Sequence, residues 1–205
     1  MAKELLAIRL ESEHFVWAGP TLARARKALA TFVKEKGLDE SLADEFAAFD
    51  RAFMASARSS AAELRSAAGQ NPWGTPWRPH IWGAGWGIQA LGVKCWILNR
   101  ELGEPFTLDI VHRSFDFVLG CHPGKNRSSY ISGVGSESVT TAYGLNRADW
   151  SYIPGGSVSG TGLIGPDYPE LLDWPYLWQQ TEYVLGGGTS DWLFLALAVK
   201  SLYNE

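Results

Sequence analysis

Residues 81–102, with the sequence IWGAGWGIQALGVKCWILNREL, carry the strongest structural signal in this chain. Their apolar residues recur at the three- and four-residue spacing of an α-helix and cover most of its circumference, which is typical of a helix buried inside a domain. We therefore predict an internal helix over residues 81–102, with Cys95 as a small core residue. The glycines of this stretch, which include Gly92, lower helix propensity, so we expect a neighbouring helix or a ligand to approach its backbone closely.

Helical patterns flank this stretch on both sides. Pro20 is favoured near a helix start and Gly37 near a helix end, so a first helix is expected between them. Apolar periodicity predicts further helices from about residues 39–41 to 68, over residues 106–119, over residues 175–185 and over residues 190–203. The last of these is expected to be capped by Thr189 or Ser190.

These helices follow one another as hairpins, which predicts an all-α fold. Helical hairpins arranged in a ring form an α/α toroid, whose loops line a cleft. Residues 1–70 are expected to be an N-terminal helical segment of the same domain as residues 71–205. Residues 120–174 show no helical pattern and contain many Gly, Ser, Pro and Tyr residues, so they are predicted to form an ordered, irregular loop wall.

The composition excludes several functional classes. The chain has 205 residues, a formal net charge of −4 and a pI of about 5.6, without a strongly basic face for nucleic acid. Its apolar runs are too short to span a membrane. Its cysteines, Cys95 and Cys121, fit neither a disulfide framework nor a metal site, so no metal or cofactor is expected. No signal peptide is recognisable, and a cytoplasmic location is expected if Met1 is the true start.

Tryptophan is unusually abundant, with ten residues, nine of which lie between Trp73 and Trp192. Part of this set is expected to fill the core. The remainder is expected to bind sugars, because a pyranose ring presents a flat C–H face that stacks on an aromatic ring. The aromatic content thus points to a carbohydrate cleft in the loop wall.

Four segments in the C-terminal part of the chain resemble motifs of glycoside hydrolase family 9. Residues 115–123, FDFVLGCHP, resemble the family segment DYVLGRNP, and residues 129–135, SYISGVG, resemble SYVTGFG. The third segment comprises PGG at residues 154–156 and GLIGPD at residues 162–167, and it is similar to PGALVGGPD. The fourth, QTEY at residues 180–183, leads into LALA and is similar to the end of the family's catalytic domain, NEVAIDYNA…ALA.

The resemblance implies an (α/α)6 catalytic barrel that hydrolyses β-linked glucan or related oligosaccharides by an inverting acid/base mechanism. An inverting enzyme uses two carboxyl groups about 6.5–9.5 Å apart. The resemblance assigns the acid to Glu182. A carboxylic acid that donates a proton needs apolar surroundings, and Tyr176, Trp178 and Tyr183 are expected to raise the pKa of Glu182 by desolvation.

Two family features are missing from this sequence. The family carries a His-Arg pair in the loop that corresponds to residues 138–147, where Arg147 alone offers a similar charge. The Asp-Ala-Gly-Asp motif that holds the family's catalytic base is also absent. We therefore expect the chain to be the C-terminal half of the barrel and nearly inactive alone. It should form a homodimer or associate with the missing N-terminal half, which would cover its apolar helix stripes.

Several loop residues are candidates for binding an oligosaccharide or polysaccharide substrate. They are Tyr130, Tyr143, Asn146, Arg147, Trp150 and Trp178, and each has loop or core packing as its alternative role. The other polar residues near them fit structural roles: His122 suits a helix C-terminus, Asp167 a turn, and Asp173 and Asp191 helix caps.

Two other functions remain open at the level of sequence. A polysaccharide lyase on an α/α toroid would need a Tyr or His base and a positive subsite for uronates, with Tyr143, Arg147 and His122 as the nearest residues. A non-catalytic half-barrel that binds carbohydrate is the third alternative. The product distinguishes them, since a hydrolase releases saturated sugars, a lyase releases unsaturated sugars, and a binding module releases none.

Overall fold

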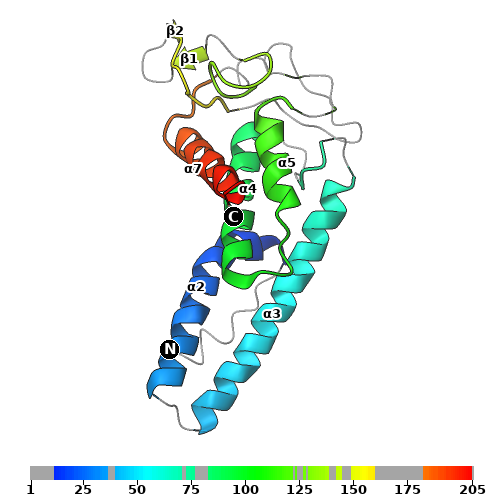
Figure 1. The fold of residues 1–205 in the computed structure, drawn as a ribbon, viewed down its shortest axis with the longest axis vertical. Helices are drawn as coiled ribbons and strands as arrows, with labels where there is room; N and C mark the ends of the chain where they lie inside the picture. Colours follow the sequence, from blue (N-terminus) through cyan, green and yellow to red (C-terminus); the bar gives the residue numbers. More distant parts are fainter. Residues whose placement is uncertain are drawn as a thin grey trace. The chain divides into compact units, whose positions relative to one another are not determined.

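The computed structural model describes residues 12–36, 40–70, 73–76, 83–121, 123, 127, 129–138, 142–144, 149–159 and 182–204. These residues form a mainly helical structure, as the apolar periodicity predicts (Figure 1). Its elements in chain order are α2 (Ser12–Lys36), α3 (Glu40–Ala68), α4 (Ala84–Leu102), α5 (Asp109–Val118), β1 (Ala142–Gly144), β2 (Asp149–Ser151) and α7 (Gly187–Leu202).

The chain divides into two compact units. The first contains Met1–Leu64 and Lys94–Thr107, and the second contains Arg65–Val93 and Leu108–Glu205. Residues 94–107 thus group with the N-terminal helices. Helix α4 therefore contributes its first half to the second unit and its second half to the first.

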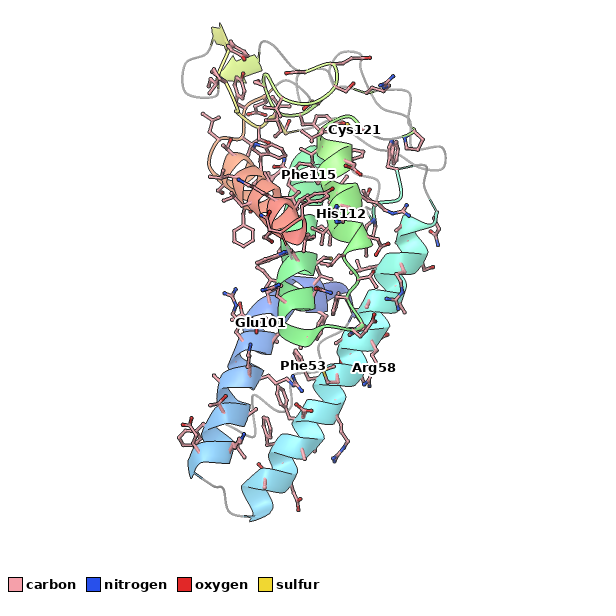
Figure 2. The ribbon with its side chains drawn as sticks, in the orientation of Figure 1. Phe53, Arg58, Glu101, His112, Phe115 and Cys121 are labelled. Atoms are coloured by element: carbon pink, nitrogen blue, oxygen red, sulfur yellow. The ribbon has the colours of Figure 1, made fainter. Side chains whose placement is uncertain are left out.

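The first unit is built on the α2–α3 hairpin. The side chain of Phe53 on α3 projects toward α2 (Figure 2), and its ring centroid lies 5.1 Å from that of Phe15. A salt bridge of 2.5 Å between Arg26 and Asp50 joins the same two helices. Buried apolar residues from both helices and from residues 94–107 form the core of this unit, namely Phe15, Ala23, Phe53, Ala57, Ala61, Leu98 and Phe106.

Helix α2 begins earlier than its sequence predicts. Its start was expected at Pro20, but the helix begins at Ser12 and Pro20 lies inside it. Proline removes one intrahelical hydrogen bond and clashes with the preceding turn. The turn before Pro20 carries Phe15 and Val16, which are 0% and 6% exposed. Burial of these two side chains stabilises the first turns of α2 despite the proline.

The second unit packs α5 against α7 and the first half of α4. The rings of Phe115 and Trp192 stack with their centroids 5.4 Å apart. A Cβ atom on Gly92 of α4 would lie 2.9 Å from Cβ of Ser114 and 3.0 Å from a methyl group of Leu195. The close helix approach expected at Gly92 is thus confirmed. Gly83 lies before α4 with a positive φ of 76°, so α4 begins at Ala84 rather than at residue 81.

The start of α7 corrects two predictions. Residues 182–185 were expected to end a helix, but Tyr183 forms a β-bridge with Val158. The N-cap of α7 is Gly186, which makes no side-chain capping bond, so neither predicted cap occurs. The hydroxyl of Ser190 instead donates to the Gly186 carbonyl at 2.7 Å, and that of Thr189 accepts a bond of 3.1 Å from the Ser157 amide.

The described part of the loop wall is irregular except for one small hairpin. Strands β1 and β2 pair in antiparallel register, with Tyr143 opposite Trp150. Isolated bridges join Ile131 to Ser157 and Val158 to Tyr183. The backbone of this region is therefore ordered by hydrogen bonds between distant segments rather than by long strands.

Candidate functional site

The segments that resemble the hydrolase motifs are hydrogen-bonded to one another through their backbones. At the end of α5, the carbonyl of Val118 accepts a bond of 2.9 Å from the amide of Tyr130. The Leu119 carbonyl accepts one of 2.8 Å from Ser136. The carbonyl of Tyr130 in turn accepts a bond of 2.9 Å from Val158, and the Ser132 amide donates to the Gly156 carbonyl at 3.0 Å. The first motif segment thus contacts the second, and the second contacts the third.

Residues 157–159, which lie between the two parts of the third segment, continue the network to the segment of Glu182. The Ser159 amide donates to the carbonyl of Glu182 at 2.9 Å, and the Val184 amide donates to the carbonyl of Ser157 at 2.9 Å. These two bonds surround the bridge between Val158 and Tyr183. Residues 182–184 therefore form a short extended pair with residues 157–159.

The pairing fixes the direction of the Glu182 side chain. Successive side chains of an extended segment point to opposite faces. Tyr183 is 4% exposed and belongs to the core of the second unit, so Glu182 points away from that core. Glu182 is half-buried. Its side chain thus lies on the face opposite that core, while its backbone carbonyl is held by the Ser159 amide.

The hydroxyl group of Tyr183 ties three segments together. It lies 2.8 Å from the hydroxyl of Ser132 and accepts a bond of 2.9 Å from the amide of Ile153. The Tyr183 ring also packs on Gly156, where a Cβ atom would lie only 2.8 Å from the ring. The residue next to Glu182 is therefore fixed by contacts at both its ring and its hydroxyl.

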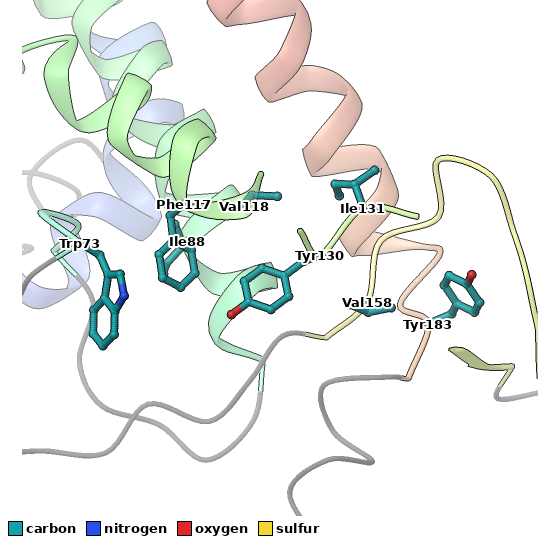
Figure 3. Close-up of a cluster of buried hydrophobic side chains, with 8 residues drawn as sticks. All are labelled: Trp73, Ile88, Phe117, Val118, Tyr130, Ile131, Val158 and Tyr183. Atoms are coloured by element: carbon teal, nitrogen blue, oxygen red, sulfur yellow. The ribbon is translucent and has the colours of Figure 1, made fainter. Parts of the chain in front are cut away.

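A single apolar core supports this region (Figure 3). The ring of Phe117 on α5 lies 5.6 Å from that of Tyr130 and 5.9 Å from that of Trp73. The core draws its members from α4, α5 and all the segments named above, namely Trp73, Ile88, Phe117, Val118, Tyr130, Ile131, Val158 and Tyr183. The position of Glu182 thus depends on a packed core.

Buried polar residues lie on the other side of residues 157–159. Nε2 of Gln89 on α4 donates to the hydroxyl of Ser157 at 3.0 Å, and both residues are 0% exposed. Within the part of the chain that the structure describes, Oε1 of Gln89 and Oγ of Ser159 have no hydrogen-bond partner. A buried polar layer therefore lies beneath the segment that pairs with Glu182.

The N-termini of α4 and α7 meet beside this layer. The amide of Trp86 donates to the carbonyl of Ser159 at 3.4 Å. Its indole Nε1 donates to Asp191 at 3.3 Å. A Cβ atom on Gly187 would lie 2.6 Å from the indole ring, so the glycine leaves the room that Trp86 occupies. Asp191, expected as a helix cap, instead accepts a bond from this indole beyond the first turn of α7.

Tyr130 does not have the position expected of a sugar platform. It is 0% exposed, and its ring packs between neighbours of the core. Core packing, the alternative role for this residue, is what the structure shows. The reason is that its backbone lies between Val118 and Val158, which turns the side chain inward.

The remaining expected substrate residues have no described side chains. The backbones of Tyr143 and Trp150 pair in the β1–β2 hairpin. Asn146, Arg147 and Trp178 lie outside the described residues, and so do His122, Asp167, Asp173 and Tyr176. Of the aromatic neighbours expected to desolvate Glu182, only Tyr183 is described, and it points to the opposite face.

Sequence reasoning missed the residues that organise the site. Gln89 and Ser157 carry no motif that marks them as a polar layer, because their hydrogen bond joins positions far apart in the chain. Tyr152, which is 52% exposed, was overlooked among many aromatic residues. A periodic pattern gives no signal for residues such as Ser157 and Tyr152, since they lie in irregular segments.

Neither a metal site nor a membrane span emerges from the described ranges. His, Cys, Asp and Glu form no group of three there that would hold a metal ion. Among the described helices, none has the length and apolar character of a membrane span. Comparison with known proteins found no family model and no curated protein sequence that matches this chain.

Proposed function

We propose that this chain is part of a glycoside hydrolase, similar to family 9, that cleaves β-linked glucan or related oligosaccharides. In this proposal the helices belong to an incomplete (α/α)6 toroid, and the loop wall lines its cleft. Glu182 is the general acid that protonates the oxygen of the leaving sugar. The half-buried position of Glu182 on the face opposite the core supports this role, because a general acid must be reachable by substrate.

The observation that carries the proposal is the order of the motif segments in the hydrogen-bond network. Backbone bonds link Val118 to Tyr130, Ser132 to Gly156, and Glu182 to Ser159, which lies between the two parts of the third segment. The four segments were recognised separately by their resemblance to one family. Their contact in the same order is expected if they build one catalytic wall.

The water-activating carboxylate belongs to a different segment in this proposal. The family's motif for that base does not occur in the chain, so a preceding segment or a partner chain supplies it. Asp173 and Asp191 are the alternatives within the chain. Asp191 is the weaker of these two, because its carboxylate already accepts the indole bond of Trp86.

Exposed apolar side chains on α7 support association with another chain or segment. Leu193, Phe194 and Leu197 are 58%, 41% and 58% exposed and occupy neighbouring positions on the helix surface. Soluble monomers rarely leave such contiguous apolar surface open. A homodimer, or pairing with the N-terminal half of the barrel, would cover it.

An assay of β-1,4-glucan oligosaccharide hydrolysis tests the function. The protein is purified from cells that carry its gene, so that any partner chain stays bound to it. Glu182→Gln keeps the shape of the side chain and removes the proton donor. It should reduce turnover by about 10²- to 10⁴-fold with little loss of stability. Glu63→Gln on α3 is the matched control, since Glu63 is exposed in the other unit. Nuclear magnetic resonance of the first product should show an inverted anomeric carbon.

Each alternative predicts a different result in the same assay. Release of unsaturated products from a polyuronate would identify a lyase. Glucan binding without turnover in the purified protein would identify a binding module. Ordinary turnover by the Glu182→Gln protein would remove Glu182 from the mechanism.

A further inference from the structure

We propose that Tyr152 is an aromatic platform that binds a pyranose ring of the glucan chain close to Glu182. This inference rests on the proposed function and adds a substrate-binding residue to it. It replaces Tyr130, whose ring is enclosed in the core.

The first support is the exposure of Tyr152. The residue is 52% exposed, although it directly precedes Ile153, which packs against the core of the second unit. Val134, on the segment that Tyr152 contacts, is also exposed at 39%. An exposed tyrosine ring offers a flat apolar face on which the C–H face of a sugar stacks, and its hydroxyl provides a polar tip.

The second support is the position of the Tyr152 hydroxyl over Gly133. The Tyr152 hydroxyl oxygen lies 2.5 Å from the point that a Cβ atom on Gly133 would occupy. Gly133 has a positive φ of 78°, a conformation that glycine adopts at no steric cost. Because Gly133 has no side chain, the Tyr152 hydroxyl can lie directly over it.

The third support is the short path from Tyr152 to Glu182. The amide of Ile153, adjacent to Tyr152, donates to the hydroxyl of Tyr183, and Tyr183 is adjacent to Glu182. One hydrogen bond and one tyrosine side chain thus span the distance between the two backbones. This distance corresponds to a few sugar units at most. The platform would hold the glucan near the scissile bond but would not touch the reacting atoms.

Binding of cellohexaose to the 205-residue chain, measured by isothermal titration calorimetry, tests the inference. Tyr152→Ala should weaken binding at least about ten-fold, whereas Tyr152→Phe, which keeps the ring, should stay within about three-fold of the unmodified chain. Tyr203→Ala is the matched control. Tyr203 is 79% exposed at the C-terminal end of α7, about 24 Å from the Gly187 end of that helix. Its loss should leave the affinity unchanged.

Turnover separates the inference from the proposed function. In the protein purified with its partners, Tyr152→Ala should raise KM for cellohexaose much more than for an aryl β-cellobioside, with kcat for the short substrate retained. Equal effects on both substrates, or unchanged binding by Tyr152→Ala, would overturn the platform while leaving the hydrolase assignment intact. Glucan binding without turnover would reject the hydrolase and retain the platform. Absence of binding and turnover in the unmodified protein would reject both. Circular dichroism of each variant confirms that the helices are retained.

Discussion

The phenolic oxygen of Tyr183 lies 2.8 Å from the hydroxyl oxygen of Ser132, and both residues are buried. The same phenolic oxygen accepts a bond from the Ile153 amide. Tyr183→Phe removes both interactions and leaves a buried polar group unsatisfied, so it should lower the free energy of unfolding by about 1–3 kcal/mol. Urea unfolding followed by tryptophan fluorescence measures this loss. Tyr203→Phe, at an exposed position, should change stability by less than about 0.5 kcal/mol.

Gly187 should not tolerate a larger residue, because the indole of Trp86 fills the space beside it. An added Cβ atom would lie 2.6 Å from the ring. Overpacking of this kind costs about 1–3 kcal/mol, more than the helix propensity that alanine would add. Gly187→Ala should therefore lower the melting temperature. Gly186→Ala is its control, since nothing lies within 4 Å of that position. Equal or higher stability of Gly187→Ala would contradict the packing described here.

Phe53 is the central side chain of the first unit. It is 3% exposed and contacts the rings of both Phe15 and Phe49. Phe53→Ala should cost about 3–5 kcal/mol through lost burial and the cavity that remains. Phe32→Ala removes a ring that is 51% exposed on α2 and should have little effect. Urea unfolding followed by far-ultraviolet circular dichroism measures the free energy of unfolding of both variants. Similar losses of stability would show that Phe53 is not the central core residue of this unit.

Asp116 introduces a small pH dependence of stability. Desolvation raises the pKa of this carboxyl above 3.8, and the charge of His112 partly offsets the rise. The folded state therefore holds the proton more tightly than the unfolded state. The stabilising contribution is complete below about pH 3.8 and is lost as the pH rises through the folded-state pKa.

Asp116→Asn should remove this dependence, so the stability of the variant relative to the unmodified chain should rise between about pH 3 and pH 6. The effect should be small, because Asp116 remains exposed to solvent on one side. Chemical denaturation at several pH values in this range measures it. Parallel stability curves for the two proteins would exclude the contribution of Asp116.

The local apolar periodicity of the sequence was sufficient to predict most helices, but it did not predict the arrangement of the candidate site. Helix α3 was predicted within one or two residues, because its apolar stripe repeats without interruption and Gly69 follows it. Residues 182–185 were predicted wrongly as helix. Their hydrogen bonds go to residues 157 and 159, and a bond between such distant positions leaves no trace in a local pattern.

The contrast between Tyr130 and Tyr152 has the same cause. Both lie in irregular segments rich in glycine and serine, and nothing in the neighbouring sequence separates them. Their exposure, 0% and 52%, is set by which distant segment covers each ring. The family resemblance located Glu182, but only the three-dimensional pairing revealed its direction.

Helix α4 has a consequence for how this chain can change during evolution. Its residues up to Val93 belong to one compact unit, and those from Lys94 belong to the other. Leu98, on its second half, is buried in the core that contains Phe15 and Phe53. A gene rearrangement that transferred residues 1–64 to another protein would leave this half of α4 without its packing partners. Residues 1–64 and the second half of α4 must therefore be inherited together, because neither part of the first unit buries its apolar side chains without the other.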